Sequence, residues 1–280
     1  MISLPTLLFA ALMSSEAAPA PTPAATPAPF VATHLLSARP LPAPVFGPQE
    51  EPAQKEKPRW KGSVNVGSTF VTGNTETTSF NATVDGELRR EKDRYTVGAF
   101  LNYSEQKDAT TGMDVETENK AGLHGKYDRF LSKKTYWLVS SRAEKDELAD
   151  VDLRFQIGAG IGRQFREDDK LKVSGEAGLS WFKEDFGMSM DDDYIAARLA
   201  SKVEWVFKSG YKLSNGTEVF PSLESGEDIY GKTDSRLSVQ LNENLLAQLQ
   251  WVLDYDNTPA AGADRVDSRV MITLGWLFGK

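Results

Sequence analysis

Apolar side chains occupy every second position over most of the chain, and this pattern is its strongest structural signal. Within 153–165, for example, Leu153 and Phe155 alternate with Arg154 and Gln156. Successive side chains of a β-strand point to opposite faces, whereas a helix repeats every 3.6 residues. The alternation therefore predicts strands with one apolar face and one face of polar or very small residues.

Twelve stretches of the chain show this alternation. Their apolar positions span 64–70, 80–88, 95–103, 115–127, 137–143, 153–165, 171–181, 195–207, 211–219, 237–241, 245–255 and 266–278. With flanking residues the expected strands are about 10–14 residues long, whereas strands of soluble sandwiches usually have about 5–6. About ten tilted residues cross the apolar band of an outer membrane, and an even strand number returns both chain ends to one side. The predicted fold is all-β, a 12-stranded antiparallel transmembrane β-barrel.

The predicted connections between these strands alternate in length. The short ones are 91–93, 128–134, 166–170, 208–210 and 242–244, and the longer, mostly acidic ones are 106–114, 146–152, 184–193, 224–231 and 256–264. One exception is the tight first connection at 72–74. Outer-membrane barrels have short periplasmic turns and longer external loops, so the start of the barrel is expected on the periplasmic side.

The alternation divides each strand into two sets of positions, which we call the apolar phase and the polar phase. Aromatic and charged residues are distributed according to these two phases. All six tryptophans lie on the apolar phase, most of them near a strand end. Amphipathic rings gather at both membrane–water interfaces of such barrels. The predicted aromatic girdle consists of Trp60, Tyr95, Trp137, Trp181, Trp205, Tyr255, Trp276 and Phe278. Charges avoid the apolar phase except at strand tips, as a lipid-facing wall requires, because a charge at mid-depth costs about 2–4 kcal/mol.

The first fifth of the chain has a different composition. Twelve of the fourteen prolines precede Trp60, and twenty-one of the twenty-two glycines follow it. Residues 1–17 contain a short apolar core followed by small residues, which predicts a signal peptide. Residues 18–59 are rich in Ala and Pro and cannot bury a core, so they predict a disordered tether. The barrel is expected to span 60–280.

The overall composition excludes several classes of protein. The longest apolar run, Leu7–Met13, is too short for a membrane-spanning helix of about 20 residues. The net charge of −8 argues against nucleic-acid binding. The absence of Cys removes disulfides, thiolate metal sites and Cys nucleophiles. A mean hydropathy of −0.40 is compatible with a barrel, because averaging hides alternation.

Residues near the start and centre of the barrel resemble a known family. The opening Trp60-Lys61-Gly62 is followed by Gly67 and by the turn sequence TGNTET at 72–77, and residues 154–162 read RFQIGAGIG. Over residues 60–280 the chain resembles the salt-induced outer-membrane protein family, a domain of unknown function. The resemblance implies an outer-membrane β-barrel connected with salt or osmotic stress, and it implies no catalytic residues.

Three glycines, Gly158, Gly160 and Gly162, follow one another on the polar phase of a single strand. A phosphate-binding glycine loop would lead into a helix, and no helix is predicted here. The better interpretation is a bare track on the inner wall. Such a track either widens a channel or lets a neighbouring side chain, such as Tyr136 or Phe182, lie across it.

The polar phase as a whole predicts the lining of the barrel interior, which we call the lumen. Its predicted members are Arg89, Lys120, His124, Arg142, Arg154, Gly158, Gly160, Gly162, Glu176, Arg198, Lys202, Glu204 and Arg236. Both signs of charge occur, which suits an ion-paired, partly plugged wall as well as a selective pore. Barrels of eight strands are filled by side chains and those of sixteen or more leave a channel, so twelve strands leave the question open.

An enzymatic function is the weakest interpretation of the sequence. A lipid-modifying enzyme with a serine nucleophile needs a histidine base that is accessible to lipid. The chain has His34, in the predicted tether, and His124, on the polar phase of a strand. His124 is therefore interpreted as plain lumen lining, and the protein is predicted not to be an enzyme.

The acidic run Asp191, Asp192 and Asp193 is a weak candidate for binding divalent cations through carboxylate oxygens, and a solvated loop is the simpler interpretation. No cofactor is predicted. The expected partners are outer-membrane lipids, lipopolysaccharide and the barrel-assembly machinery, with no nucleic acid and the oligomeric state left open. Three functions remain: a small channel linked to salt stress, a structural envelope-integrity barrel with a closed lumen, and, last, an outer-membrane lipid-modifying enzyme.

Overall fold

The computed structural model describes residues 58–71, 76–108, 110–188, 191–226, 228–259 and 264–279. Within these ranges the chain forms strands connected by turns and loops, and no helix there is long and apolar enough to cross a membrane. The strands are β1 (Trp60–Val71), β2 (Thr77–Arg89), β3 (Asp93–Lys107), β4 (Asp114–Phe130), β5 (Thr135–Asp146), β6 (Val151–Glu167), β7 (Leu171–Phe186), β8 (Asp192–Lys208), β9 (Tyr211–Pro221), β10 (Ile229–Gln240), β11 (Leu245–Asp256) and β12 (Val266–Phe278).

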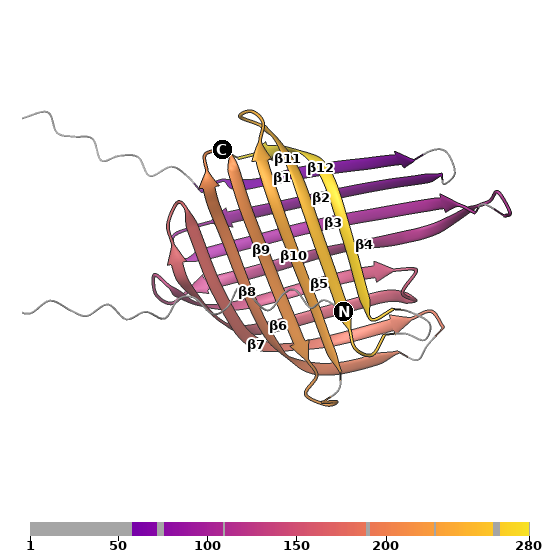
Figure 1. Ribbon diagram of the computed structural model, residues 1–280. Helices are drawn as coiled ribbons and strands as arrows, with labels where there is room; N and C mark the ends of the chain where they lie inside the picture. Colours follow the sequence, from indigo (N-terminus) through magenta and orange to yellow (C-terminus); the bar gives the residue numbers. More distant parts are fainter. Residues whose placement is uncertain are drawn as a thin grey trace, which may run out of the picture. The chain divides into compact units, whose positions relative to one another are not determined.

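These strands form one closed antiparallel barrel (Figure 1). Each strand pairs with its neighbours in sequence, and β1 closes the sheet by pairing with β12. The closing seam is short, from Gly62↔Phe278 to Val66↔Leu274, whereas β1 and β2 pair along the whole of β1. The predicted all-β, twelve-stranded antiparallel barrel is confirmed.

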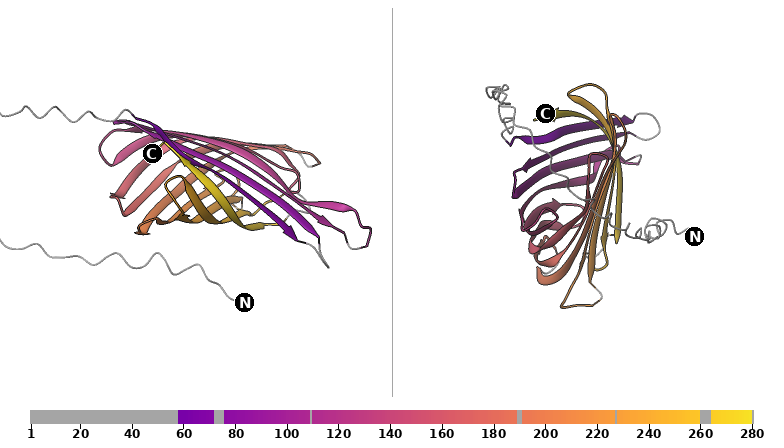
Figure 2. Two further views of the ribbon diagram at one scale, coloured as in Figure 1. Left: turned by 90° about the horizontal axis from the view of Figure 1, so that it is seen from above. Right: turned by 90° about the vertical axis from the view of Figure 1, so that its left-hand side faces the viewer.

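Several strands are longer than the sequence predicted. Strand lengths range from 11 residues in β9 to 17 in β4, β6 and β8, against an expected maximum of about 14. The β3–β4 hairpin extends visibly beyond its neighbours (Figure 2). Backbone hydrogen bonds between paired strands continue into polar segments. There the alternation of apolar side chains is missing and does not indicate a strand. The connections are correspondingly shorter than predicted, as in 147–150 between β5 and β6.

The two ends of the barrel differ. We call the end with connections 90–92, 131–134, 168–170, 209–210 and 241–244 the turn end, and the opposite end the loop end. The two-residue connection between β8 and β9 contains Gly210 with φ +80°, a conformation that side-chain-bearing residues rarely adopt. Trp60 and Phe278 lie at the turn end, so the barrel begins and ends there.

Apolar and polar side chains separate between the two faces of the wall. Along β12, Val270, Ile272 and Leu274 are 67%, 76% and 64% exposed, whereas the intervening Met271 and Thr273 are 6% and 2% exposed. A period of two puts these sets on opposite faces. The apolar face is thus the outside of the barrel, and the polar face lines the lumen.

Three predicted features fall outside the described residues. These are the signal peptide at 1–17, the tether at 18–59 except for Pro58 and Arg59, and positions 72–75 of the family motif.

Candidate functional site: the barrel interior

The predicted lumen residues all lie on the polar face of the wall, from Arg89 near the turn end of β2 to Arg236 in β10. Alternation places them there because each follows or precedes an outward apolar residue. The period of a single strand does not determine which of these side chains meet across the lumen. That depends on the closed barrel. The most informative contacts are those between strands that are not neighbours in the sheet.

Two ion pairs connect opposite walls of the barrel directly. Lys232 of β10 lies 2.9 Å from Glu144 of β5, and Lys120 of β4 lies 3.1 Å from Asp254 of β11. Lys232 is also 3.3 Å from Asp254, which joins the two pairs. Lys120, Glu144 and Asp254 are each less than a tenth exposed. Four side chains therefore span the lumen from wall to wall.

A second group of charges continues this network toward the turn end. Arg142 of β5 lies 2.7 Å from Glu218 of β9, which also accepts a 2.5 Å hydrogen bond from Arg198 of β8. Arg198 donates a further 2.9 Å hydrogen bond to Glu176 of β7. Glu176 in turn pairs with Lys126 of β4. The network therefore links β4, β5, β7, β8 and β9 through the middle of the barrel.

Three further ion pairs join strands that are not neighbours in the sheet. Arg269 of β12 pairs with Glu118 of β4 at 2.6 Å, and Arg236 of β10 pairs with Asp85 of β2 at 2.5 Å. Arg154 of β6 reaches Asp256 of β11 at 2.8 Å. Buried ion pairs gain little over apolar packing, but removing one partner leaves a buried charge and costs about 3–5 kcal/mol. The network is therefore expected to hold its charged groups in one arrangement.

Aromatic side chains fill the lumen beside β7–β10 in the loop half. Phe182 stacks on Tyr194 with ring centroids 5.0 Å apart, and Phe220 meets Phe182 edge-on at 5.1 Å. Tyr230 packs on Phe220 at 5.9 Å, and the Arg154 guanidinium lies 4.6 Å from the Tyr230 ring centroid. All four rings are buried. The lumen beside β7–β10 is therefore occupied by packed aromatic rings.

The glycine track of β6 accommodates one of the two side chains proposed for it. A Cβ at Gly162 would meet ring atoms of Tyr136 at 2.4 Å, so Tyr136 lies across this glycine. Phe182 packs in the aromatic cluster instead. A Cβ at Gly158 or Gly160 would meet the neighbouring strand β7 within 3 Å. The track therefore serves close packing of the inner wall.

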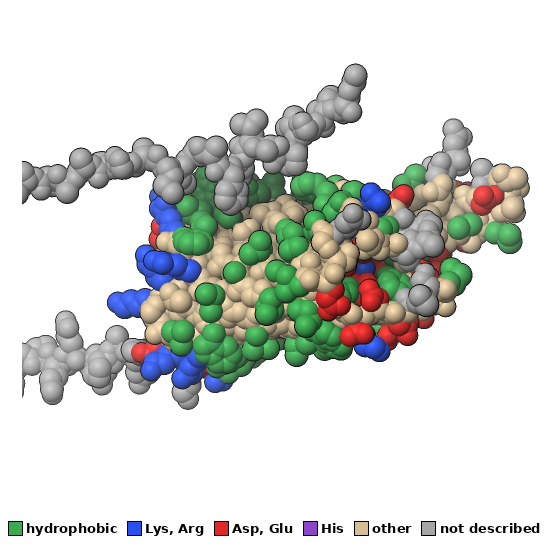
Figure 3. Space-filling model, turned by 90° about the horizontal axis from the view of Figure 1, so that it is seen from below, with side chains coloured by type: hydrophobic (Ala, Val, Ile, Leu, Met, Phe, Trp, Pro, Cys, Tyr) green, Lys and Arg blue, Asp and Glu red, His purple; other side chains and the backbone are tan. Residues whose placement is uncertain are grey.

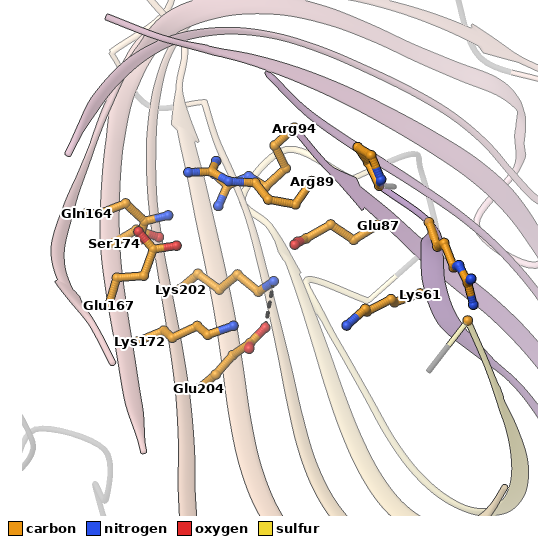
Figure 4. A pocket seen from close by; sticks show the side chains of 13 residues that line it. Lys61, Glu87, Arg89, Arg94, Gln164, Glu167, Lys172, Ser174, Lys202 and Glu204 are labelled. Atoms are coloured by element: carbon orange, nitrogen blue, oxygen red, sulfur yellow. Dashed lines mark ion pairs between the residues drawn. The ribbon is translucent and has the colours of Figure 1, made fainter. Parts of the chain in front are cut away.

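A cavity of about 400 Å³ remains at the turn end of the lumen (Figure 4). We call it the vestibule. It is lined by Pro58, Arg59, Lys61, Glu87, Arg89, Arg94, Gln164, Glu167, Lys172, Ser174, Lys202, Glu204 and Gly279. Lys202 and Glu204, both predicted lumen residues, form a 2.8 Å ion pair within it. The cavity thus lies at the turn end, and the ion pairs between opposite walls lie deeper in the barrel.

The predicted girdle residues lie on the outer face near the strand ends. Trp60, Tyr95, Trp137, Trp205, Trp276 and Phe278 lie toward the turn end, and Trp181 and Tyr255 toward the loop end. Around the turn end, Tyr127 contacts Tyr95 at 5.0 Å and Trp137 at 5.3 Å between ring centroids. Trp205, Phe207 and Tyr211 form a similar row. Aromatic rings thus follow one another along this rim.

The two rims carry opposite charge (Figure 3). Exposed basic residues at the turn end include Arg90, Lys92, Lys133, Lys134, Arg163, Arg166, Lys170, Lys208 and Lys212. Exposed acidic residues at the loop end include Asp114, Glu116, Glu147, Asp152, Asp191, Asp192, Asp193, Glu224, Asp264 and Asp267. The acidic loops were anticipated from the sequence, and the basic turn end was not.

His124 and the acidic run at 191–193 are the two weaker candidates from the sequence. His124 faces the lumen across Gly98, and a Cβ at Gly98 would meet its ring at 2.3 Å. Asp191 accepts a hydrogen bond from the backbone of Phe186 at 3.2 Å, and Asp193 one from the Trp181 indole at 3.4 Å. Within the described ranges, no group of three His, Cys, Asp or Glu side chains could hold a metal ion.

Several members of the network were not predicted from the sequence. Glu218, Lys232, Asp254 and Arg269 were not among the predicted lumen residues, although each makes an ion pair across the lumen. Their position on the polar phase of their own strands was a usable signal, since Glu218 precedes the outward Val219.

The chain is similar in fold to several solved barrels. These include the NanC porin in a rhombohedral crystal form (9% identity, 80% of this chain and 100% of that one, TM-score 0.46) and an outer membrane channel from Pseudomonas putida F1 (14%, 82% and 100%, 0.44). The KdgM porin is a third (7%, 79% and 99%, 0.40). No curated protein matches the chain. A family model described as "Protein of unknown function, DUF481" matches residues 64–278, nearly the whole barrel, and the chain therefore belongs to this family.

Proposed function

We propose that this protein is an outer-membrane barrel with a closed lumen that serves the integrity of the envelope. The apolar outer wall supports the membrane location. Side chains such as Ile272 and Leu274 are mostly exposed on it, and similar residues surround the barrel. Soluble monomers rarely expose contiguous apolar patches above a few hundred Å². A lipid bilayer would cover this wall and remove the cost of exposing apolar side chains to water. The aromatic residues near both ends suit the two interfaces of a bilayer.

The orientation that we propose places the turn end in the periplasm. Short turns on one side and longer loops on the other are typical of bacterial outer-membrane barrels. The N-terminal segment then joins the barrel at Pro58 from the periplasmic side. The outer wall would contact lipids and lipopolysaccharide, and the barrel-assembly machinery would act during insertion.

The ion pairs across the lumen carry the closed-lumen proposal. Lys232–Glu144 and Lys120–Asp254 join opposite walls, and each occupies the space through which a solute would pass. Opening a path requires several buried charges to separate at once, and each unpaired buried charge is costly. A barrel held in this way is a rigid transmembrane body.

A second candidate function is a small channel linked to salt or osmotic stress. The vestibule favours it, because about 400 Å³ of the lumen is hollow at the turn end. At about 1 M salt the Debye length falls to about 3 Å, which weakens ion pairs that water can reach. In this alternative, high salt loosens the network and opens a path from the vestibule through the barrel.

Planar-bilayer recording of the refolded protein separates the two functions. The closed lumen predicts no steady conductance from about 0.1 to 1 M KCl at either polarity. Steady conductance at all salt concentrations would contradict the closed lumen. Conductance that appears only at high salt would instead establish the salt-linked channel.

A quadruple variant tests whether the ion pairs are the closure. Arg142→Ser, Glu218→Ser, Lys232→Ser and Glu144→Ser keep the net charge. They remove both partners of Arg142–Glu218 and of Lys232–Glu144, and they also end the contacts of Arg198 with Glu218 and of Lys232 with Asp254. We expect steady conductance from this variant. The matched control, Arg166→Ser with Asp168→Ser, removes an exposed pair at the turn end and should stay silent. If the quadruple variant folds, as judged by heat-dependent gel migration, and remains silent, the ion pairs are not the closure.

A further inference from the structure

The basic side chains of the lumen divide into two groups according to whether they are paired. In the middle of the barrel, Arg142, Arg198 and Lys232 each contact a carboxylate within 3 Å. In the vestibule, Lys61 and Lys172 have no carboxylate within ion-pair distance in the described part of the chain. The vestibule therefore holds unpaired cations beside two paired ones, Lys202 with Glu204 and Arg94 with Asp128.

Each of the two unpaired lysines lies opposite a glutamate of the neighbouring strand. Lys61 lies opposite Glu87 in the β1–β2 register, and Lys172 lies opposite Glu167 in the β6–β7 register. Neither lysine forms an ion pair with the carboxylate opposite to it. Both ammonium groups extend from facing walls toward the centre of the vestibule (Figure 4). Two positive charges thus face the same empty volume.

Arg89, the last residue of β2, adds a third cation to the lining of the vestibule. Its guanidinium lies 3.6 Å from the centroid of the Phe130 ring, which holds its plane. Its Nη1 atom is buried and has no hydrogen-bond partner. A buried donor without a partner is costly. The Arg89 side chain also lines the vestibule, where its positive charge would attract an anion. In all, six basic and three acidic side chains line the cavity.

We propose that the vestibule binds a small soluble ligand that carries two neighbouring anionic groups, such as a diphosphate or a dicarboxylate. Lys61 and Lys172 would contact the two groups from opposite walls, and Arg89 would add a third positive charge to the lining. The volume of about 400 Å³ lies in the range of small-molecule sites. The cavity lies inside the barrel and opens at its aqueous end, so a lipid headgroup held at the outer wall would not reach it. The inference does not depend on whether the lumen conducts.

Inorganic pyrophosphate is a suitable probe for calorimetric titration of the full chain refolded in zwitterionic micelles. At physiological ionic strength, where exposed charges beyond about 8 Å are screened, we expect saturable binding at one site. The variant Lys61→Gln/Lys172→Gln should weaken binding by about tenfold or more, the effect of losing charge-assisted hydrogen bonds. Both side chains are exposed to the cavity and unpaired, so the variant should fold normally.

The matched control is Lys134→Gln/Lys170→Gln. It removes the same charge from exposed turns at the same end, outside the vestibule lining, and should change affinity by less than about twofold. Equal losses in both double variants would assign the binding to the charge of the rim and overturn the proposal. Absence of saturable binding to the unaltered chain would overturn it as well.

A lipid source of the anion is tested in vesicles. Pyrophosphate affinity should be the same in phosphatidylcholine vesicles with and without phosphatidylglycerol. A loss of about tenfold on adding phosphatidylglycerol would mean that a lipid headgroup occupies the vestibule, and would contradict a soluble ligand.

Discussion

The ring of Tyr136 lies across Gly162, its direct partner in the β5–β6 register. A Cβ at Gly162 would sit 2.4 Å from Cε2 and Cζ of the ring, so only glycine leaves room for it. Tyr136 is fully buried, and its hydroxyl donates a 2.7 Å hydrogen bond to Glu176. The glycine thus places an aromatic ring that in turn holds a carboxylate of the ion-pair network. Cross-strand pairs of glycine and an aromatic residue are a known means of fixing strand register.

Gly162→Ala should destabilise the barrel by about 1–3 kcal/mol, because the methyl group displaces Tyr136 and its hydrogen bond to Glu176. The measurement is urea unfolding in lipid vesicles followed by tryptophan fluorescence. Gly216→Ala is the control, since a Cβ there meets nothing within 4 Å. It should change the free energy of unfolding by no more than about 0.5 kcal/mol. Similar effects of the two substitutions would contradict the packing of Tyr136 on Gly162.

Arg198→Met should cost about 3–5 kcal/mol, since it leaves the buried carboxylate of Glu176 and the half-buried carboxylate of Glu218 each without one of its cations. Arg166→Met removes an arginine whose side chain is 59% exposed and should cost at most about 1 kcal/mol. Unfolding in urea at neutral pH measures both values. A cost for Arg198→Met near that of Arg166→Met would show that the network is not rigidly coupled.

Single cysteines can test the proposed orientation, because the natural chain contains none. Thr111→Cys introduces a thiol at the exposed loop end, and Lys170→Cys introduces one at the exposed turn end. A membrane-impermeant maleimide should label the Thr111→Cys protein in intact cells. It should label the Lys170→Cys protein only after the outer membrane is permeabilised. The reverse pattern would invert the orientation.

Asp168 in the turn between β6 and β7 should titrate below its usual range. Hydrogen bonds from the Arg166 side chain and from the backbone amides of Leu171 and Lys170 lower its pKa. Because the folded-state pKa is depressed, the stabilisation is present above the ordinary pKa near 3.9 and is lost as pH falls through the folded value. Carboxyl chemical shifts measured between acid and neutral pH give this pKa. Arg166→Gln should raise it, and an unchanged value would show that Arg166 makes no such hydrogen bond in solution.

The strand count, the faces and the order of the barrel follow from the sequence. Alternation along β6 places Arg154 and Gly158 inward and Phe155 and Ile157 outward, because the side-chain period of a strand is two. The contact of Tyr136 with the glycine track was also within reach, since adjacent hairpin strands pair in a register that the turn limits to a few choices. Strand ends were less accurate, because hairpin pairing continues where the apolar signal stops.

Only the closed barrel decided which charges meet. Lys232 and Glu144 are separated by 88 residues and lie on strands that are not neighbours, so neither period nor register relates them. Their contact depends on the distance between opposite walls, which strand tilt and stagger set together with strand number. The same geometry places the ion pairs between opposite walls in the middle of the barrel and the vestibule at its turn end. Sequence therefore determined which side chains face inward, and tertiary structure determined which of them meet across the lumen, because the width of a barrel is a property of all its strands at once.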